Sequence, residues 1–560
     1  MSLRTHLILP IILSALAVLA GCGGTSNPVV TPPPSGSFSN SNLTGTYVFS
    51  ATGTVNDAPV NDFVTIMGAF TADGKGNITG GVIDQNSTVA NGLILESNVT
   101  SGTYSVGSDG RPTGNSNLPS GLITLQSGAG TFQFDYVLTS SEHGLVTEFE
   151  SFGSASGTLD LQSAVTQANI NGQSFAFNFT GSSGFSTSLC GISNGTAFVI
   201  PYATVGAFTL DSSGNISTGL EDFNNNCVSS GSTNLAVTGG SVILTPGTTF
   251  GKATITTPSG TGSITYSFDV FPIDATHMKF IEVDSLPILV GDAFTQSSSI
   301  PTGNNVFTVA GFDPLVPGAF TAAGLIVTDG SGNVTTGSVE DINDAGVASE
   351  VTGITGSFTT LTGGRSELTL TGFVNGNNGV ACSGCLFAVY PSSGGLQMLE
   401  IDNGGMTNGI AYPQSTTTLA SGEGYGMNLS GATSNSSEDD IAEFTNNNGS
   451  FTGIVDLNDQ GATSFKNTFS ATYTADPTVS GRGTVANPKN GYLLTTYVVD
   501  SATTVVVSTD PSIVALGALV KQNAAAKSNV AANHLAVLRI NPSAHMTKSV
   551  MKKALPTRSK

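Results

Sequence analysis

Several residue types that soluble proteins ordinarily use are scarce in this chain of 560 residues. Trp is absent, His and Cys occur five times each, and only 10% of the residues are charged, against about 25% in an ordinary soluble domain. No His residues cluster at the spacing of metal ligands, which argues against a His-based zinc or iron site. We therefore expect neither a bound metal nor a cofactor.

Catalytic signatures are also missing. The sequence shows no Gly-x-Ser-x-Gly elbow between a strand and a helix and no Gly-x4-Gly-Lys phosphate loop. His143 and His277 stand in no recognisable acid–base framework. The sequence therefore predicts no catalytic residues, and we expect the protein not to be an enzyme.

Basic residues are few and unevenly placed. Residues 22–520 hold eight Lys or Arg against all 38 acids, a net charge of −30, whereas the chain from Lys521 onward holds eight Lys or Arg and no acid. So acidic a body repels phosphate backbones, which argues against nucleic acid as a partner. Apolar residues, at 39%, are numerous enough for packed cores, which excludes a globally disordered chain.

The N-terminus has the organisation of a secretory signal. Arg4 and His6 precede an apolar run from Leu7 to Leu19, and small residues follow it. This run is shorter than the roughly 20 apolar residues of a membrane-spanning helix. We therefore expect residues 1–21 to be a signal peptide.

The four residues Leu19-Ala20-Gly21-Cys22 resemble the lipobox of bacterial lipoproteins. The resemblance implies that the signal is removed before Cys22, that the Cys22 thiol is diacylated, and that the new amino group is acylated, for instance with palmitate. Such acyl chains would anchor the protein to a membrane of the cell envelope. Gly23 stands where lipoproteins retained at the inner membrane have Asp, which favours the outer membrane where one exists.

Residues 22–42 form a tether rich in Pro, Ser and Asn after the lipidated Cys. Three consecutive prolines, Pro32 to Pro34, favour an extended polyproline conformation. We expect this tether to hold the first folded unit away from the membrane.

Residues 43–524 consist of four imperfect copies of one unit, at 43–165, 166–299, 300–417 and 418–524. Each copy shows the same landmarks in the same order: a turn Gly, an Asp-x-Asn motif, a basic residue after Gly, an acidic strand and a closing Gln. The motifs begin at Asp84, Asp222, Asp341 and Asp456, the basic residues are Arg111, Lys252, Arg365 and Arg482, and the closing residues are Gln162, Gln296, Gln414 and Gln522. The step from the start of the acidic strand to the closing Gln is 14 residues in every copy, which chance does not explain.

Each copy divides into about eight short β segments separated by turn residues, with no helical periodicity before residue 520. Alternating apolar and polar residues, as at 132–136 and 266–270, are typical of strands with one wet face. The Asp-x-x-Gly-Asn turns favour hairpins over calcium loops, because they offer far fewer than six oxygen ligands. The sequence predicts an all-β protein of four tandem antiparallel meanders, each closed into a small barrel, with β-sandwiches as the alternative.

The opening residues 43–47, Leu-Thr-Gly-Thr-Tyr, and the eight-strand meander resemble the avidin and lipocalin barrels (calycins), which begin with Gly-x-Trp. The resemblance implies up-and-down barrels. Biotin binding is not carried over, because avidins stack biotin on tryptophans and this chain has none.

Four cysteines remain besides Cys22: Cys190 and Cys227 in the second copy, and Cys382 and Cys385 in the third. The single C-x-x-C lacks further zinc ligands nearby, and its Ser-Gly centre favours a hairpin tip over the helix start of a thioredoxin-like site. In an oxidising envelope we expect two disulfides, one in each copy.

The acidic strands carry the most suggestive side chains. Their acidic residues include Glu148, Glu282, Asp284, Glu400 and Asp402. Carboxylates two positions apart on a strand project from one face, and in the second copy that face also holds Met278 and Phe280. These carboxylates could therefore line a pocket.

The recurring basic residues predict an ion pair within each copy. In so acidic a chain, a base at the same position in every copy indicates a fixed anionic partner, and the acidic strand follows 30 to 37 residues later. We expect structural latches, with ligand binding as the lesser alternative, between Arg111 and Glu148, Lys252 and Glu282, and Arg365 and Glu400. In the fourth copy Ser508 replaces the Glu, so Arg482 would turn to Asp456 or Asp510 or lie in water.

Residues 525–560 form a basic tail. Met546, Val550, Met551 and Leu555 recur at helical spacing beside lysines, so a partly helical tail could lie on anionic lipid. The interpretation favoured by the sequence is a disordered solvated tail, or one folded onto the acidic body.

These observations predict a lipid-anchored envelope protein that acts as a non-enzymatic binding or structural surface module. Its expected partners are the membrane, through the acyl chains, and an unidentified protein, glycan or small molecule. The alternatives are a small-ligand carrier with pockets inside the barrels and a carbohydrate-active enzyme. A deep lumen reaching Met278 and Phe280 would favour the carrier, filled interiors the structural module, and opposed carboxylates in an open cleft the enzyme.

Overall fold

The computed structural model describes residues 37–524. The gaps within this range are 56–61, 90–91, 115–119, 152, 190–191, 226–231, 260–261, 285, 299, 301, 314–317, 377–378, 403, 434–435 and 488–491. Cys22, Cys190, Cys227 and the basic tail therefore lie outside the described residues. Within the described part, no helix is long and apolar enough to cross a membrane.

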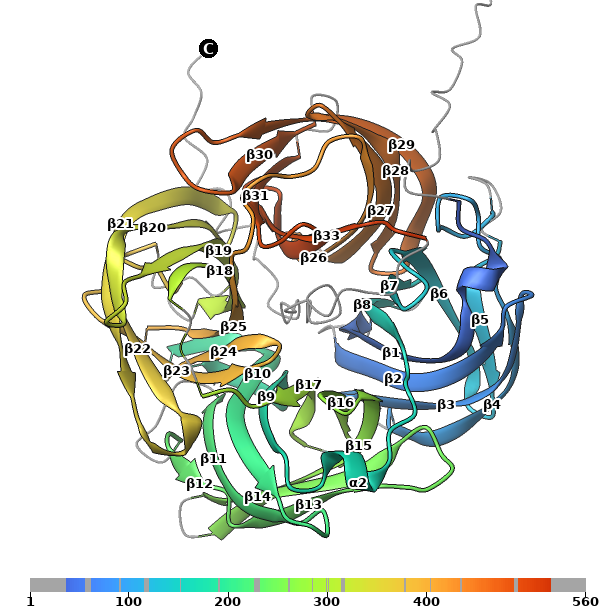
Figure 1. Cartoon of the computed structure of the whole chain (residues 1–560), viewed down its shortest axis with the longest axis horizontal. Helices are drawn as coiled ribbons and strands as arrows, with labels where there is room; N and C mark the ends of the chain where they lie inside the picture. Colours follow the sequence, from blue (N-terminus) through green and yellow to red (C-terminus); the bar gives the residue numbers. More distant parts are fainter. Residues whose placement is uncertain are drawn as a thin grey trace, which may run out of the picture. The chain divides into compact units, whose positions relative to one another are not determined.

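The all-β prediction is confirmed. The described strands form three closed antiparallel barrels of eight strands and one open sheet of nine strands. We call them barrel 1 (β1–β8), sheet 2 (β9–β17), barrel 3 (β18–β25) and barrel 4 (β26–β33), and their colours run from blue to red in chain order (Figure 1). Strands that follow one another in sequence are neighbours, as a meander requires, throughout the three barrels and in sheet 2 except between β12 and β13.

The strands of barrel 1 and sheet 2 cover the first half of the fold. Barrel 1 consists of β1 (Thr44–Val55), β2 (Asp62–Asp73), β3 (Asn77–Ser87), β4 (Ile94–Thr103), β5 (Ile123–Ser127), β6 (Gly130–Leu138), β7 (His143–Glu148) and β8 (Gly153–Leu161). Sheet 2 consists of β9 (Ser174–Leu189), β10 (Ile192–Leu210), β11 (Ile216–Asn225), β12 (Leu235–Ala236), β13 (Gly239–Leu244), β14 (Gly251–Ser259), β15 (Gly262–Asp274), β16 (His277–Glu282) and β17 (Ile288–Thr295).

The strands of barrels 3 and 4 repeat the same order. Barrel 3 consists of β18 (Gly303–Asp313), β19 (Gly318–Thr328), β20 (Asn333–Asp344), β21 (Val347–Thr360), β22 (Ser366–Thr371), β23 (Cys385–Ser392), β24 (Gly395–Glu400) and β25 (Met406–Pro413). Barrel 4 consists of β26 (Glu423–Thr433), β27 (Ser437–Asn447), β28 (Ser450–Asp459), β29 (Ala462–Ala475), β30 (Arg482–Ala486), β31 (Leu493–Val498), β32 (Thr503–Ser508) and β33 (Ile513–Lys521). The described helices are η1 (Asn40–Asn42), α2 (Gln167–Ile170) and η2 (Thr362–Gly364).

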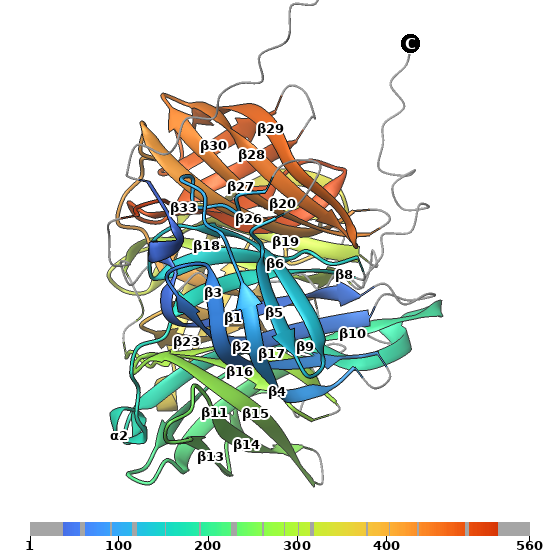
Figure 2. The same cartoon turned by 90° about the vertical axis from the view of Figure 1, so that its right-hand side faces the viewer.

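Sheet 2 differs from the three barrels at its fourth strand. That strand is split into β12, which pairs with β11, and β13, which pairs with β14, so the ladder does not close. A single bridge links Asn215, just before β11, to Ser241 of β13. The first hairpin of this sheet, β9 and β10, is also longer than its counterparts, and both strands can be followed in Figure 2.

The hairpin turns behave as the sequence predicted. Oδ1 of Asp73 accepts the backbone N–H groups of Lys75 and Asn77 at 2.7 and 3.0 Å, and these bonds with the Asn77 side chain lower the pKa of Asp73 to about 2. Gly76 adopts a φ of 106°, in the left-handed region that favours glycine. The equivalent turns at Asp211 and Asp329 make the same bonds.

Burial shows which strands meet another sheet. In β1, Tyr47 and Phe49 point into the barrel core, while Val48 between them packs against residues of sheet 2. The acidic strands β7, β16, β24 and β32 are buried along their whole length. The wet face that the sequence predicted at 132–136 and 266–270 is not found, because Asp135 and Asp269 are buried and Gln133 and Ser267 are half-buried. The fold therefore has four cores and additional apolar contacts between sheets.

Candidate functional site at the interfaces between the barrels

Each sheet contacts the next one through buried apolar residues. We name each interface by the two sheets that it joins. Interface 1–2 contains Val48, Met67, Ala69, Val82, Phe271, Ile273, Ile281 and Val290, and interface 2–3 contains Ala176, Val205, Ala207, Ala388, Tyr390, Leu399 and Ile401. Interfaces 3–4 and 4–1 share one cluster, which includes Ala310, Ala319, Leu325, Tyr497, Val505 and Val514, and reaches Val137 and Leu145 of barrel 1.

The Asn of every Asp-x-Asn motif crosses an interface. Its side-chain amide donates to backbone carbonyls that follow the acidic strand of the next sheet or end it. Asn86 donates to Glu282 and Asp284 (2.8 and 2.9 Å), Asn224 to Glu400 and Gly405 (3.1 and 3.3 Å), Asn343 to Ser508 and Asp510 (3.0 Å each), and Asn458 to Glu148 and Gly153 (2.7 and 2.9 Å). This motif therefore joins two sheets.

The closing Gln of every copy also reaches the next sheet. Gln162 donates to Thr249 and Pro272, Gln296 to Gly363, Gln414 to Ser480 and Val498, and Gln522 to Asp109 and Leu138, all at backbone carbonyls. Because Gln522 of barrel 4 binds barrel 1, as Asn458 does, the contacts run from each sheet to the next and close on the first. The Asn and the closing Gln of the repeat are therefore residues of the interfaces between sheets.

The latch predicted within each copy is wrong, because the basic residues bind across the interface. Nε and Nη2 of Arg365 donate to the two carboxylate oxygens of Asp222 in sheet 2, both at 2.8 Å. Arg111 pairs with Asp456 of barrel 4, across interface 4–1, through Nη2 alone. The partner is thus the Asp of the preceding copy's Asp-x-Asn motif, and Glu148 and Glu400 are not bound by these bases.

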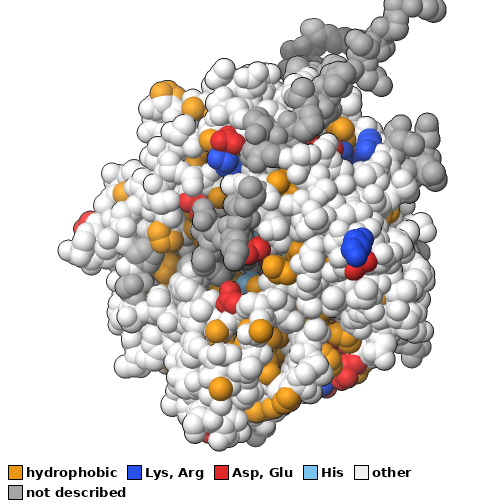
Figure 3. All heavy atoms as spheres, turned by 45° about the vertical axis from the view of Figure 1, so that its right-hand side comes forward, with side chains coloured by type: hydrophobic (Ala, Val, Ile, Leu, Met, Phe, Trp, Pro, Cys, Tyr) orange, Lys and Arg blue, Asp and Glu red, His pale blue; other side chains and the backbone are white. Residues whose placement is uncertain are grey.

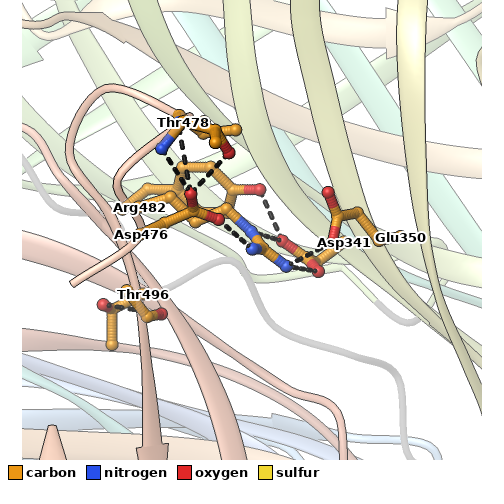
Figure 4. A network of polar contacts seen from close by, with 9 residues as sticks. Asp341, Glu350, Asp476, Thr478, Arg482 and Thr496 are labelled. Carbon is orange, nitrogen blue, oxygen red and sulfur yellow. Dashed lines mark hydrogen bonds and ion pairs between the residues drawn. The ribbon is translucent and has the colours of Figure 1, made fainter. Parts of the chain in front are cut away.

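Arg482 shows this arrangement in full (Figure 4). Its guanidinium binds Asp341 of barrel 3 twice at 2.8 Å, Glu350 at 2.9 Å and Asp476 of its own barrel at 2.5 Å. Asp476 is held by the backbone and hydroxyl of Thr478, which keep its pKa near 2 against the effect of burial. Asp456 and Asp510, the partners expected from the sequence, are not used.

Lys252 is the exception among the four basic residues. Its ammonium binds Asp269 of its own sheet at 2.5 Å and also pairs with Glu96 of barrel 1. The Lys252 side chain is 51% exposed, whereas those of Arg111 and Arg365 are 0% and 1% exposed. Interface 1–2 therefore has the weakest of the four recurring ion pairs.

The acidic strands place their Glu residues inside the barrels. Burial raises the pKa of Glu148 and Glu282 to about 9, and that of Glu400 well above its usual range, so these carboxyls are uncharged at neutral pH. Glu400 is held by Asn375 at 2.7 Å and by the Thr407 hydroxyl at 2.8 Å. These groups end a packed core instead of lining an open pocket.

The second acid of each strand lies beside the first, as its spacing predicted. Asp284 and Asp402 are close enough to their partners to add to the pKa increase of Glu282 and Glu400. Asp402 accepts backbone N–H groups of Leu386 and Gly404 at 2.7 and 2.6 Å, and Asp284 is exposed. Asp402 therefore ties the strand to its neighbour.

The interior of sheet 2 is filled with aromatic rings. Met278 and Phe280 are fully buried, and the Phe280 ring lies 5.1 Å from Phe179 and 5.6 Å from Phe268 between ring centroids. A small cavity of about 30 Å³, which would hold one or two water molecules, lies where barrel 1, sheet 2 and barrel 3 meet, beside Phe63, Asn224 and Met406.

A buried charge network in interface 1–2 was missed by sequence reasoning. His143 binds Asp160 at 2.7 Å and His277 binds Asp292 at 2.7 Å, while the Lys279 ammonium lies between them, 3.6 Å from Asp160 and 3.0 Å from Asp292. Although burial opposes ionisation, Lys279 lowers the pKa of both carboxylates. A signal existed: each His stands five residues before the Glu of its acidic strand.

The cysteine and motif predictions have mixed outcomes. Cys382 and Cys385 form a disulfide, with 5.6 Å between their Cα atoms, as predicted, whereas Cys190 and Cys227 lie outside the described residues. The residues 191–195 do match Gly-x-Ser-x-Gly, but residues 192–195 belong to strand β10, which continues to Leu210, so no helix follows the Ser as a strand-to-helix elbow requires. Within the described part, no group of His, Cys, Asp and Glu is arranged to hold a metal ion.

No protein-family model matches the chain, and no characterised protein matches it. Among solved structures, the chain is similar to the isotype 1 transferrin-binding protein B from serogroup B Neisseria meningitidis. The identity is 10%, the TM-score is 0.18, and the match covers 70% of this chain and 85% of that chain. A likeness this low leaves the function to be argued from the residues of this chain.

Proposed function

We propose that the chain is a lipid-anchored protein of the cell envelope that acts as a non-enzymatic binding or structural surface module. The observation that carries this proposal is that the Asn, Gln and basic residues repeated in the copies join neighbouring sheets. The repeated residues therefore serve to join the four sheets to one another, instead of forming four separate ligand pockets.

The carrier alternative receives less support from the interiors. A carrier needs a lumen for its ligand, typically about 300–1,000 Å³, and aromatic side chains fill the core of sheet 2 around Met278 and Phe280. Barrel 1 is filled in the same way by rings such as Phe49 and Phe134, whose centroids lie 5.1 Å apart. Among the described residues, the packing thus favours binding on outer surfaces.

The enzyme alternative receives less support from the carboxyls. A glycosidase needs two carboxyls about 5–10 Å apart on opposite sides of a bound sugar. Glu148, Glu282 and Glu400 are buried, uncharged at neutral pH and distributed one to a sheet. Their burial fits a structural role at the ends of the packed cores.

The lipid anchor is proposed from the lipobox, and with it the outer-membrane location. Replacing Cys22 with Ser should abolish acylation and move the protein from the detergent phase to the aqueous phase in detergent partitioning. Cys382→Ser with Cys385→Ser is the control, because it removes two cysteines outside the lipobox and should leave partitioning unchanged. Detergent-phase partitioning of the Cys22→Ser chain would contradict the anchor.

The binding role is tested on the soluble chain, residues 23–560, applied to arrays of glycans and of envelope proteins. The proposal predicts saturable binding without chemical change of the bound partner. A small molecule released in stoichiometric amount on denaturation would instead support the carrier, and cleavage of an arrayed glycan would support the enzyme.

A further inference from the structure

Each interface holds the Asp of one Asp-x-Asn motif and a hydrogen-bond donor from the sheet that follows. At interfaces 2–3 and 3–4 this donor is a tyrosine. The hydroxyl of Tyr390 donates to Asp222 at 2.6 Å, and the hydroxyl of Tyr497 donates to Asp341. Burial raises the pKa of both phenols well above the usual range, so these donors keep their protons from acidic to mildly alkaline pH.

At the two interfaces of barrel 1, a second carboxyl takes the place of the tyrosine. Asp269 makes a side-chain hydrogen bond with Asp84 at interface 1–2, and Asp135 makes one with Asp456 at interface 4–1. All four carboxyls are fully buried. Because a carboxylate has no proton to donate, each of these bonds requires a proton on one of its two carboxyls.

The tyrosines and the second carboxyls belong to one four-residue segment of the repeat. This segment reads Phe-Asp-Tyr-Val at 134–137, Phe-Asp-Val-Phe at 268–271, Phe-Ala-Val-Tyr at 387–390 and Leu-Thr-Thr-Tyr at 494–497. Its first residue pairs with the last residue of β7, β16, β24 or β32, so the four segments are structurally equivalent. Each copy has Asp at the second position or Tyr at the fourth, and none has both.

The carboxyl pair at interface 1–2 depends on its shared proton. Apart from the bond between them, Oδ2 of Asp84 and Oδ2 of Asp269 accept no hydrogen bond within the described part of the chain. The charged groups that face the pair are the ammonium of Lys252, whose side chain is 51% exposed, and Glu96, which adds negative charge. Burial raises the pKa of Asp269, and that of Asp84 to about 7, so a rise through neutrality removes the proton. Two buried carboxylates then face one half-exposed cation, which weakens the interface.

We propose that interface 1–2 is a pH-sensitive switch, which is closed in mildly acidic surroundings and opens in mildly alkaline ones while interfaces 2–3 and 3–4 stay closed. Opening separates barrel 1 from sheet 2 and exposes apolar side chains such as Val48 and Phe271. Interface 4–1 contains the same kind of carboxyl pair, but its cation, Arg111, is fully buried and holds Asp456. We therefore expect interface 1–2 to open first.

Other titratable groups require that the opening is measured at this interface itself. His143 with Asp160 and His277 with Asp292 flank the Lys279 ammonium, also in interface 1–2. Elsewhere, at least 20 of the 38 acidic residues are buried, and on the face drawn in Figure 3 the charged side chains are few and separate. A change of pH therefore acts at several places inside the fold.

The test uses two cysteine reporters in the soluble chain, residues 23–560. Val48→Cys lies in interface 1–2, and Val205→Cys, the matched control, lies in interface 2–3; both valines are fully buried. Alkylation is measured by peptide mapping at pH 5.5 and 8.5, relative to the same site in urea at the same pH, which removes the effect of thiol ionisation. Protection of the Val48→Cys thiol should fall at least about tenfold between these pH values, because each pH unit above the pKa shifts the equilibrium about tenfold. Protection of the Val205→Cys thiol should not change.

Variants of Asp269 assign the effect to the carboxyl pair. Asp269→Asn supplies a permanent donor, so the fall at Val48→Cys should shrink to less than about twofold. Asp269→Ala with Phe271→Tyr gives sheet 2 the segment Phe-Ala-Val-Tyr of barrel 3 and should have the same effect, so it decides the question if the Asn variant does not fold. Glu96→Gln is the control, because Glu96 also binds Lys252 but takes no part in the carboxyl pair, and the fall should persist.

Three results would overturn the proposal. They are equal protection of the Val48→Cys thiol at both pH values, an equal fall at Val205→Cys, which would show general loosening, and a fall that persists in both Asp269 variants, which would assign the pH dependence to the histidines. None of them bears on the lipid anchor or on the binding role, which are tested separately.

Discussion

Replacing Arg365 with Ala should leave a buried carboxylate without its cation. The Arg365 side chain is 1% exposed and that of Asp222 is 0% exposed, and two N–H groups reach the two carboxylate oxygens at 2.8 Å. Breaking a buried pair in this way costs about 3–5 kcal/mol. The Tyr390 hydroxyl and the Asn234 backbone still donate to Asp222, so we expect the free energy of unfolding to fall by about 3 kcal/mol.

The assay is urea unfolding of the soluble chain, with Arg365→Ala, Asp222→Asn and the double variant. The sum of the losses in the two single variants should exceed the loss in the double variant by about 1–3 kcal/mol, which is the coupling energy of the pair. Lys252→Ala is the matched control, because Lys252 has the same position in the repeat but is 51% exposed, so its loss should be about 0–1 kcal/mol. A loss for Arg365→Ala no larger than this control, or additive losses in the cycle, would refute the reasoning. The cycle of Arg365→Ala with Glu400→Gln should be additive, since these side chains do not meet.

Three further predictions concern burial and cross-links. Lys279→Met should lower the free energy of unfolding by about 3–5 kcal/mol, because Asp160 and Asp292 then face each other in a buried site without a cation. Adding Asp292→Asn to the same chain should recover part of this loss, as measured by urea unfolding. The pKa of Glu148 and Glu282 is raised to about 9 in the folded state, so the folded protein keeps protons that the unfolded chain releases above about pH 4.5. The stabilisation from these two carboxyls is therefore complete below about pH 4.5 and is lost as the pH rises through 9. Tm should accordingly be higher at pH 5.5 than at pH 8.5, with a shallower slope in Glu282→Gln, and a Tm that rises over this range would contradict the burial of these carboxyls. Replacing both Cys382 and Cys385 with Ser should lower the free energy of unfolding by about 2 kcal/mol or less, because the disulfide closes a very short loop, and a larger loss would show that the bond shapes barrel 3 beyond that loop.

The all-β fold could be predicted from the sequence because its signals are local. Apolar alternation and turn residues such as Asp73 and Gly76 act over a few positions, so they identify strands and hairpins wherever the copies are placed. The repeat also identified residues that join the sheets, since Asn86, Arg365 and Gln522 all make specific contacts with a neighbouring sheet.

The partners of those residues could not be predicted, because they belong to other copies. A repeat shows that a base and an acid recur together, but not whether the pair forms within one unit or between neighbours. Arg365 was assigned to Glu400 on distance along the chain, yet it binds Asp222, which stands 143 residues earlier. The split of the fourth strand in sheet 2 could not be predicted for a related reason, since it occurs in only one place and no repetition points to it. The network around Lys279 has a signal in only two of the copies, the His five residues before the Glu of the acidic strand.

The central claim is that the four sheets form one closed cycle in which the last barrel binds the first. Interface 4–1 provides a direct test, because the hydroxyls of Thr54 in barrel 1 and Ser437 in barrel 4 lie 2.6 Å apart and both residues are buried. Replacing both with Cys and mapping peptides under non-reducing conditions should show a disulfide between the two introduced cysteines after mild oxidation, while Thr54→Cys alone yields no new cross-link. If both new thiols stay free to react with an alkylating agent in the folded protein, barrel 4 does not bind barrel 1 as described and the closed cycle is contradicted.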